Sequence, residues 1–380
     1  MDFNLTEEQL MIQQAARDFA QNELLPGVIE RDKTQTFPTE QVKKMGEMGF
    51  LGMMVDPKYG GAGLDSISYV LAMEEISKID ASAAVVMSVN NSLVCAGLEK
   101  YASEAQKQKY LVPLASGEVI GAFALSEPEA GSDATSQKTT AEDKGDYYLL
   151  NGTKNWITNG GNATYYIVIA QTHPEKGHKG INAFIVEKGW EGFDIGPKED
   201  KMGIRGSDTH SLLFTDVKVP KENRIGEDGF GFTFAMSVLN GGRIGIASQA
   251  LGIASGAYEL ALKYAKERKA FGKEIIQHQA VAFKLADMAT QITAARMLCF
   301  KAAAEKDQGL DISESGAMAK LFASKTAMDT TIEAVQVHGG YGYVKEYHVE
   351  RLMRDAKITQ IYEGTSEIQK IVISRSIAKK

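Results

Sequence analysis

The sequence predicts an α+β protein with three successive parts: helices, then a sheet, then a helical bundle. Residues 1–120 carry the apolar periodicity of helices, whereas residues 121–232 hold short β-branched and aromatic runs between Asn-Gly and Lys-Gly turns. From residue 233 long helical patterns return. Because the predicted strands follow one another without helices between them, we expect an antiparallel sheet or barrel rather than a doubly wound parallel sheet.

The first part is predicted to be helical from its start. Residues 6–9 fit a capping box that opens a helix, and this helix should end near Pro26. Residues 103–106 repeat the same signal. Between these two boxes, residues 69–76 and 83–98 form apolar helical runs.

The other two parts are predicted from the same kinds of pattern. Strands are expected at residues 147–150, 165–170, 183–186 and 211–219. Long helices are expected at residues 253–267, 281–305 and 318–337. Each of these helices is longer than the typical length of about 11–12 residues, which indicates a bundle.

The composition excludes some classes of protein. The chain has 380 residues, enough for two or three domains, and its formal net charge of −7 argues against a dedicated nucleic-acid binder, because phosphates need a basic surface. Cys95 and Cys299 lie in apolar helical sequence, so we expect buried, reduced thiols rather than a disulfide. The 6 histidines lack the spacing of zinc ligands, and no metal site is expected.

Neither membrane insertion nor export is predicted. No stretch approaches the roughly 18 uninterrupted apolar residues of a membrane-spanning helix. The acidic start lacks the basic region and apolar core of a signal peptide, so a cytoplasmic location is the default expectation. A mature organellar protein cut to this point would read the same way.

Two segments of the sheet region are candidates for binding a cofactor. Neither G-x-G-x-x-G nor G-x-x-x-x-G-K-[ST] occurs, so a nucleotide cofactor would be bound by other means. Residues 123–133 run from an apolar strand through a Pro turn to a Gly-Ser-Asp step, which can present N–H groups to a pyrophosphate. In residues 155–161, Trp156 and Thr158 share a strand face. Taken alone, each segment fits an ordinary loop or a core tryptophan better.

The segment 360–369 contains a candidate for acid–base chemistry. Gly364 interrupts a helical pattern, and Ser366 and Gln369 fit a capping box that opens another helix. Glu363 is therefore predicted to lie in a tight connection. Burial in an apolar pocket would raise the pKa of its carboxyl above the usual value of about 4.3, which suits a general base. The alternative is a solvated loop glutamate.

Two more segments are suggestive only in combination with the others. Residues 268–272 begin with Arg268, a cation at the end of a long predicted helix, where it would complement the helix dipole. Residues 336–343 form a Gly-rich loop after a helix, suited to close approach by a ligand or to a simple helix end.

Together and in this order, these five segments resemble the acyl-CoA dehydrogenase family, over essentially the whole chain. The resemblance implies a helical N-terminal domain at residues 1–120, a central antiparallel β-barrel-like domain at residues 121–232 and a C-terminal four-helix bundle at residues 233–380. It also implies a homotetramer built as a dimer of dimers.

The resemblance further implies FAD as the cofactor, shared between subunits. One subunit would hold the flavin ring and ribityl chain with Phe123, Ala124, Leu125, Ser126, Gly131, Ser132, Trp156, Ile157 and Thr158. A neighbouring subunit would contact the diphosphate and adenine with Arg268, Phe271, Gln279, Gln336, Val337, His338, Gly339 and Gly340. The cofactor would be met near the active site by Thr365, Ser366 and Glu367.

The substrate implied by the resemblance is an acyl-CoA. Its CoA portion would be contacted by Ser132, Asn240, Gly241, Gly242 and Arg243, and its thioester would lie beside Gly364. Glu363 matches the base that removes the α-proton, helped by hydrogen bonds to the carbonyl from its own N–H and a ribityl hydroxyl. The β-hydrogen would pass as hydride to the flavin, giving a trans-2-enoyl-CoA. Electron-transferring flavoprotein would then take the electrons.

Short-chain (butyryl-CoA) members are the most similar in residues 87–93 and 242–247. In the isovaleryl and long-chain branches the base is a Glu just before the arginine that matches Arg243, whereas here that residue is Gly242. No arginine stands near residues 90–91, as glutaryl-CoA relatives would have. Medium- or branched-chain specificity is the alternative within the same fold.

Two departures from the family pattern are Glu129, where Gly or Asn is usual, and Asn240, where Asp is usual. Three other functions are the alternatives to this one. An acyl-CoA oxidase is expected to carry a further C-terminal domain, and a nitroalkane oxidase an Asp base. A flavin-free binding or scaffolding protein would have no reason to combine Glu363, Arg268 and the Trp-Ile-Thr strand.

Overall fold

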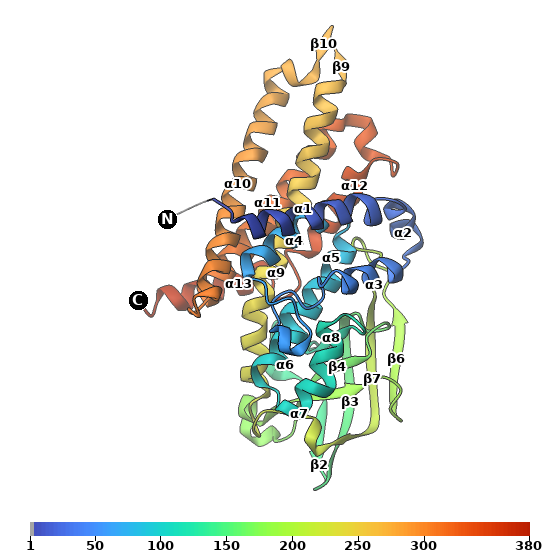
Figure 1. Ribbon diagram of the computed structural model, residues 1–380, viewed down its shortest axis with the longest axis vertical. Coiled ribbons are helices and arrows are strands. Elements are labelled where there is room, and N and C mark those ends of the chain that lie inside the picture. Colours follow the sequence, from blue (N-terminus) through green and yellow to red (C-terminus); the bar gives the residue numbers. More distant parts are fainter. Residues whose placement is uncertain (1–3) are drawn as a thin grey trace.

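The computed structural model describes residues 4–380. Its first part is helical, and Figure 1 shows these helices packed across the middle of the molecule. Its α-helices are α1 (Glu7–Phe19), α2 (Val28–Thr34), α3 (Thr39–Glu47), α4 (Ser66–Ile79), α5 (Ala81–Ser88), α6 (Ala96–Tyr101), α7 (Glu104–Gln106) and α8 (Val112–Ala115). π-helical turns at Ala20–Leu24, Val89–Cys95 and Lys107–Leu111 continue several of them.

Both capping boxes predicted in this part are confirmed. At α1, Thr6 Oγ1 accepts the Gln9 N–H at 3.2 Å, and Gln9 Oε1 accepts the Thr6 N–H at 3.0 Å. At α7, Ser103 and Gln106 exchange the same pair of bonds. The first helical run continues through its π-helical turn to Leu24, so it ends just before Pro26 as predicted.

The segment Ala81–Tyr101 is the most apolar helix of this part. It is long and apolar enough to cross a membrane by length and composition, but 94% of its most apolar window is buried inside the structure. Polar residues such as Ser88 and Asn90 interrupt its apolar run. Buried helices in the core of a large domain have this character. Cys95 on this segment and Cys299 are both free and buried, as predicted.

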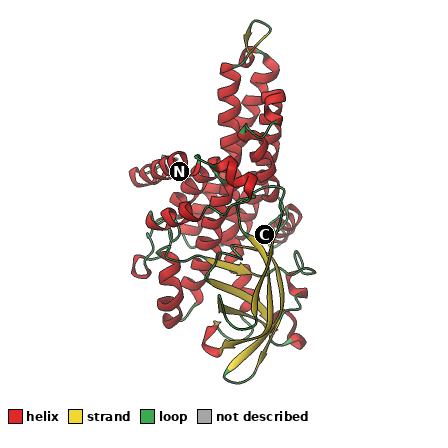
Figure 2. Ribbon diagram, turned by 90° about the vertical axis from the view of Figure 1, so that its right-hand side faces the viewer, coloured by secondary structure: helices red, strands yellow, loops and turns green. Residues whose placement is uncertain are grey.

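The middle part is an eight-stranded sheet with the order β6-β7-β3-β2-β4-β5-β8, in which β1 also pairs with β4 (Figure 2). The strands are β1 (Gly121–Ala124), β2 (Thr140–Asp143), β3 (Tyr147–Thr158), β4 (Tyr165–Gln171), β5 (Ile181–Glu187), β6 (Phe193–Lys198), β7 (Thr209–Pro220) and β8 (Arg224–Ile225). The four predicted strands correspond to parts of β3, β4, β5 and β7. The pairing is mostly antiparallel, as predicted, but β1 runs parallel to β4.

The sheet curls around a core of its own. Inward side chains from β3, β4, β5, β6 and β7 meet in one cluster that includes Tyr148, Tyr166, Phe184, Phe193 and Phe214. On β4 the neighbouring residues Ile167 and Ile169 instead join the larger core, which the helices share. Because side chains alternate along a strand, one face of β4 lines the sheet's interior and the other packs on the helices.

The last part is a bundle of long helices. It comprises α9 (Gly231–Glu267), the hairpin β9 (Lys269–Ala270) and β10 (Lys273–Glu274), α10 (Gln279–Asp307), α11 (Ser313–His338), α12 (His348–Ile358) and α13 (Ser366–Ile377). In Figure 1, α9 and α10 extend as a long hairpin with β9 and β10 at its tip.

Helix α9 begins 22 residues before the predicted start at residue 253, since it starts at Gly231. Glycines hide the helical pattern there, and they serve close packing. A β-carbon at Gly252 would overlap the backbone of Glu74, and one at Gly256 would lie 2.5 Å from the carbonyl oxygen of Lys78. The N-terminal helix α4 therefore lies directly against α9, which joins the first and last parts.

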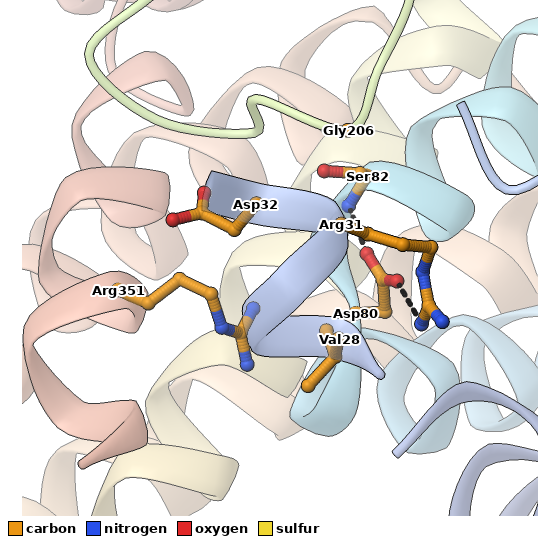
Figure 3. A pocket seen from close by; sticks show the side chains of 7 residues that line it. All are labelled: Val28, Arg31, Asp32, Asp80, Ser82, Gly206 and Arg351. Atoms are coloured by element: carbon orange, nitrogen blue, oxygen red, sulfur yellow. Dashed lines mark hydrogen bonds and ion pairs between the residues drawn. The ribbon is translucent and has the colours of Figure 1, made fainter. Parts of the chain in front are cut away.

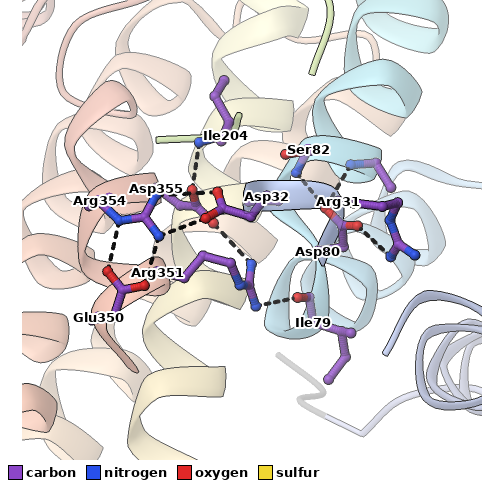
Figure 4. Close-up of polar contacts among 12 residues, drawn as sticks. Arg31, Asp32, Ile79, Asp80, Ser82, Ile204, Glu350, Arg351, Arg354 and Asp355 are labelled. Carbon is purple, nitrogen blue, oxygen red and sulfur yellow. Dashed lines mark hydrogen bonds and ion pairs between the residues drawn. The ribbon is translucent and has the colours of Figure 1, made fainter. Parts of the chain in front are cut away.

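A partly buried ion pair and the buried Arg351 join α12 to the first part (Figure 4). Arg354 Nη2 lies 2.8 Å from Asp32 Oδ2 on α2. Arg351 donates to Asp355 Oδ2 at 3.0 Å and to the carbonyl oxygen of Ile79 at 2.7 Å. Burial raises the pKa of Asp355 to about 6, although the Arg351 charge opposes this rise. Such a network costs much to break once one partner is lost, because the other charge stays buried.

A closed cavity lies in the same junction (Figure 3). Its volume of about 10 Å³ suits roughly one water molecule and no substrate. On one side of it Arg31 pairs with Asp80 at 3.0 Å. The lining is Val28, Arg31, Asp32, Asp80, Ser82, Gly206 and Arg351. Together with the ion pairs, this junction fixes α12, whose end leads directly into the loop of Glu363.

Candidate active site

Glu363 lies in the short connection between α12 and α13. Its backbone has φ of 51°, the left-handed region that is uncommon for a residue with a side chain, and Gly364 follows with φ of 92°. The predicted tight connection is confirmed.

The predicted capping box at Ser366 and Gln369 is wrong. The N-cap of α13 is Thr365, whose Oγ1 accepts the Ile368 N–H at 3.4 Å. Gln369 instead turns its side-chain amide back to the carbonyl oxygens of Glu363 (3.2 Å) and Gly364 (2.8 Å). The pattern was off by one residue, because the left-handed turn at Glu363 and Gly364 leaves Thr365 extended.

The carboxylate of Glu363 faces the interior. The residue as a whole is partly exposed, but its Oε2 is buried and has no hydrogen-bond partner within residues 4–380. The alternative of a solvated loop glutamate is therefore wrong for this chain. Burial raises the pKa of Glu363 to about 7, against the lowering effect of the nearby charges of Lys320 and Arg243.

The residues of α9 predicted to contact substrate include the neighbours of this carboxylate. A β-carbon at Gly242 would overlap Glu363 Oε2 and would lie 2.8 Å from Leu93 Cδ2. Arg243 is buried, and its Nη1 donates to Asn240 Oδ1 at 2.6 Å. Burial lowers the pKa of the Arg243 guanidinium, and the charge of Glu363 opposes that effect.

A second cation, Lys320 of α11, was not predicted. Its side chain is fully buried, and its Nζ donates to the carbonyl oxygen of Gly364 at 2.7 Å. Burial lowers its pKa to about 8, while Glu363 acts in the opposite direction. The signal was present in the sequence, because Lys320 is the one charged residue within residues 318–324 of the helix predicted at 318–337.

A large cavity lies in the C-terminal part, near the tip of the long helical hairpin, between the end of α9 and the loop that follows α11. Its volume is about 560 Å³, and it is lined by Tyr264, Arg268, Ile275, Val337, His338, Gly339, Gly340, Tyr341, Val344 and Glu346. Tyr264 stacks on His338 with ring centroids 4.3 Å apart, and the Arg268 guanidinium lies over the Tyr341 ring. The structure thus brings together five of the residues predicted to bind a cofactor diphosphate.

Three residues predicted for the same contacts do not line this cavity. Phe271 stands at the tip of the β9–β10 hairpin, 96% exposed and with φ of 52°. Gln279 is the exposed first residue of α10, and Gln336 is exposed near the end of α11. In a single chain these side chains project outward, where another chain or ligand could reach them.

The two candidate segments of the sheet lie side by side. The Asn155 N–H donates to the carbonyl oxygen of Ser126 at 2.8 Å, which joins the loop after β1 to β3. Trp156 is 59% exposed with φ of 62°, so the alternative of a core tryptophan is wrong. Ile157 is buried and Thr158 is partly exposed. That Trp156 and Thr158 share one face stays a prediction, because the pairing of β3 with β7 is irregular between Lys154 and Ile157.

A buried ion pair that was not predicted supports this surface. Lys154 Nζ lies 2.7 Å from Glu127 Oε1 and donates to the carbonyl oxygen of Leu125 at 2.9 Å. Glu127 in turn accepts the backbone N–H groups of Lys138 (2.6 Å) and Thr139 (3.0 Å). Because it joins β3 to both ends of the loop, the pair holds the predicted cofactor loop in place.

The remaining predicted residues are less constrained. Gly131 and Ser132 are exposed in the loop after β1, and Phe123 is partly buried while Ala124 is fully buried. At the start of α13, Ser366 is partly exposed and Glu367 exposed. Gly241 lies on α9 with only the Ser92 carbonyl oxygen, at 3.8 Å, near a β-carbon built there.

A buried carboxylate oxygen with no hydrogen-bond partner within residues 4–380, set between helices of the first and last parts, is the arrangement of an enzyme active site. Sequence models of one family cover almost the whole of this chain. The acyl-CoA dehydrogenase N-terminal domain matches residues 6–118, the middle domain residues 122–217 and the C-terminal domain residues 229–378. The chain belongs to the acyl-CoA dehydrogenase family, whose members are oxidoreductases.

Individual relatives agree with this assignment. A short-chain specific acyl-CoA dehydrogenase of Clostridium acetobutylicum is 53% identical over 377 residues, which covers 99% of this chain and 100% of that protein. The butyryl-CoA dehydrogenase structure from Megasphaera elsdenii superposes with a TM-score of 0.98 at 50% identity and full coverage of both chains.

Two further solved structures are similar to this chain. A chain in a structure of the electron transferring flavoprotein of Acidaminococcus fermentans has a TM-score of 0.99 at 53% identity, covering 100% of both chains. The structure of PigA with FAD and proline has a TM-score of 0.96 at 31% identity, covering 100% of this chain and 99% of that one.

Proposed function

We propose that this chain, with FAD as its cofactor, dehydrogenates a short-chain acyl-CoA to the trans-2-enoyl-CoA, and that Glu363 removes the α-proton. One observation carries the proposal: Glu363 Oε2 is buried and unpartnered within residues 4–380, in the field of the buried Lys320 and Arg243. A carboxyl with a pKa raised to about 7 holds a proton more strongly than a solvated glutamate, yet is largely ionised above neutral pH. Family membership and the short-chain activity of the relatives support the reaction.

Glu363 supplies two groups for the first step. Its carboxylate takes the α-proton of the thioester, which is far less acidic than a carboxylic acid. Its backbone N–H makes no hydrogen bond within residues 4–380, so it is free to donate to the thioester carbonyl and stabilise the developing enolate. Bound FAD supplies the acceptor for the hydride that leaves the β-carbon.

The residues present fit FAD on two counts. The 560 Å³ cavity sets the Arg268 cation near Gly339 and Gly340, where backbone is free of side chains, and this suits a diphosphate. On the sheet, the exposed ring of Trp156 and the hydroxyl of Thr158 suit a planar ring with polar edges. The cavity lining contains no residue of the sheet, which supports a cofactor shared between subunits of a homotetramer.

The other contacts remain predictions carried over from the family. They are the flavin contacts of Phe123, Ala124, Leu125, Ser126, Gly131, Ser132 and Ile157, the nucleotide contacts of Phe271, Gln279 and Gln336, and those of Thr365, Ser366 and Glu367. For the substrate they are the CoA contacts of Ser132, Asn240, Gly241, Gly242 and Arg243 and the placement of the thioester beside Gly364.

We further propose electron-transferring flavoprotein as the electron acceptor, a cytoplasmic location and domain boundaries at residues 120 and 232. The chain 53% identical to this one in the Acidaminococcus fermentans flavoprotein structure supports the first. The ranges matched by the three family domains support the boundaries. Medium- or branched-chain substrates are the alternative within the same chemistry.

The test is an anaerobic titration of the purified flavoprotein with butyryl-CoA, octanoyl-CoA and glutaryl-CoA, following bleaching of the flavin band. Preferential bleaching by butyryl-CoA is the expected result. Bleaching by another thioester alone would retain the chemistry and overturn the chain length. The Glu363→Gln variant is expected to keep its flavin and its acyl-CoA binding but to show no bleaching. Normal bleaching in that variant would remove Glu363 from the mechanism.

A further inference from the structure

Two buried side chains donate hydrogen bonds to the backbone carbonyl oxygens of Glu363 and Gly364. Lys320 Nζ donates to the Gly364 carbonyl oxygen at 2.7 Å. Gln369 Nε2 donates to the same oxygen at 2.8 Å and to the Glu363 carbonyl oxygen at 3.2 Å. Lys320 and Gln369 both have no exposed surface. A cation from α11 and an amide from α13 therefore stabilise the same turn by hydrogen bonds.

This turn needs such support. Glu363 adopts a left-handed conformation with φ of 51°, which a non-glycine residue keeps only when its surroundings determine it. The turn also sets where the carboxylate and the free N–H of Glu363 point. A loss of the hydrogen bonds from either side chain would let the backbone relax and would move the carboxylate and the N–H of Glu363.

The charge of Lys320 has no carboxylate partner of its own. No ion pair of Lys320 lies within 4.0 Å in residues 4–380, and its hydrogen bond goes to a neutral carbonyl. Arg243 is likewise paired only with the neutral amide of Asn240. Glu363 is therefore the carboxylate toward which both buried cations act.

We propose that Lys320 is a positioning residue for the reaction: it fixes the Glu363–Gly364 turn and supplies a buried positive charge against which Glu363 ionises. This rests on the proposed role of Glu363 as the base. Lys320 touches the loop and not the reacting atoms, so its effect is exerted through Glu363.

The titratable groups that face Glu363 come from several packed elements. Those that affect it or are affected by it are Lys320 of α11, Arg243 of α9, Tyr69 of α4, the adjacent Tyr362 and, through Lys320, Glu367 of α13. Only Lys320 and Arg243 are cations. Both lower the pKa of the Glu363 carboxyl, and Lys320 has the larger effect. Removal of the Lys320 charge therefore raises that pKa.

The experiment compares two variants, each of which removes the hydrogen bonds of one of these side chains to the turn. Lys320→Met removes the hydrogen bond and the charge, whereas Gln369→Met removes hydrogen bonds without a change in charge. The rate of flavin bleaching by butyryl-CoA is measured in single turnovers of the FAD-bound protein across pH. Both variants are expected to slow the maximal rate by roughly 10- to 100-fold, because the base is misplaced. The pH–rate profile has an acidic limb, the range in which the rate rises as Glu363 ionises. Only Lys320→Met is expected to move the midpoint of this limb to higher pH, by about one pH unit.

Two more variants complete the design. Lys325→Met removes an exposed cation from the same helix, where it pairs with Asp329, and should leave both the rate and the limb unchanged. Lys320→Arg keeps a charge at the site, and its limb should stay at the wild-type pH. If Lys320→Met does not fold, the test uses the acidic limbs of Lys320→Arg and Gln369→Met. A shift of the limb to higher pH in either variant would overturn the proposed effect of the Lys320 charge.

A wild-type rate and limb in folded Lys320→Met would overturn the proposal altogether. The same shift in Gln369→Met as in Lys320→Met would show that loop movement and not charge sets the limb, and would also overturn it. The Glu363→Gln variant separates this outcome from failure of the proposed function. If Glu363→Gln is inactive while Lys320→Met behaves as the wild type, only the inference about Lys320 fails.

Discussion

The Glu363 carboxylate fills the space that a side chain on Gly242 would need: a β-carbon on Gly242 would overlap Oε2 of that carboxylate. The two residues are 121 positions apart in the chain, as their numbers show, yet α9 brings one directly against the other. A side chain at position 242 therefore cannot occupy the site together with the Glu363 carboxylate in its present place.

The Gly242→Ala variant is expected to lose activity without losing its fold. The added methyl group displaces the Glu363 carboxylate, and a shift of about 1 Å costs roughly 100-fold in rate. Flavin bleaching by butyryl-CoA measures the loss. Gly316→Ala on α11 is the control, since the nearest atom to its β-carbon would be the Asn240 carbonyl oxygen at 3.4 Å. Equal activity in the two variants would contradict the placement of the carboxylate.

The rate of flavin reduction is expected to rise with pH through about 7. The folded-state pKa of Glu363 is raised to about 7, so the carboxyl is protonated and inactive as a base below that pH and ionised above it. Stopped-flow bleaching with butyryl-CoA between pH 5.5 and 8.5 measures the limb, with the flavin content checked at each pH. A rate that is flat down to about pH 5 would mean that the base keeps the usual glutamate pKa of about 4.3.

Sequence patterns predicted the order of the three parts well, because helices and strands differ in the period of their apolar residues. The predicted strands within β3, β4, β5 and β7 are examples. The start of α9 was missed, because its glycines serve packing against α4 and weaken the apolar pattern. The parallel pairing of β1 with β4 was also missed, since pairing depends on the path of the chain and not on local sequence.

The sequence predicted the residue proposed as the base, but not the side chains that hold its loop and the cofactor loop in place. Glu363 was found because the turn signals around it and the family resemblance coincide. The supports of Lys320 and Lys154 were not found, since Lys320 acts on a carbonyl oxygen 44 residues away and Lys154 on a carboxylate 27 residues away. Gln369 was expected in a capping box and instead binds the carbonyl oxygen of Gly364, 5 residues before it. Contacts of that kind are set by tertiary packing. Only Lys320 gave a visible sign, as a charged residue within an apolar helical run.

Arg268→Ala is expected to weaken FAD retention. The Arg268 guanidinium lines the 560 Å³ cavity beside the Gly-rich loop, where it can pair with a diphosphate. The ratio of flavin to protein absorbance is measured before and after dialysis. Lys266→Ala, which removes an exposed cation from the same helix end, serves as the control. Unchanged flavin content in Arg268→Ala would count against the assignment of this cavity to the diphosphate.

Lys154→Met is expected to destabilise the sheet domain by about 3–5 kcal/mol, because Glu127 would stay buried without its ionic partner. The chain offers a direct readout, since its 2 tryptophans, Trp156 and Trp190, both lie in this part. Urea unfolding followed by tryptophan fluorescence therefore reports on the sheet domain. Lys144→Met removes a cation from a solvent-exposed pair with Glu142 and should leave the transition unchanged. If Lys154→Met unfolds at the wild-type urea concentration, the ion pair does not stabilise the loop, and the exposed position of Trp156 must depend on other contacts.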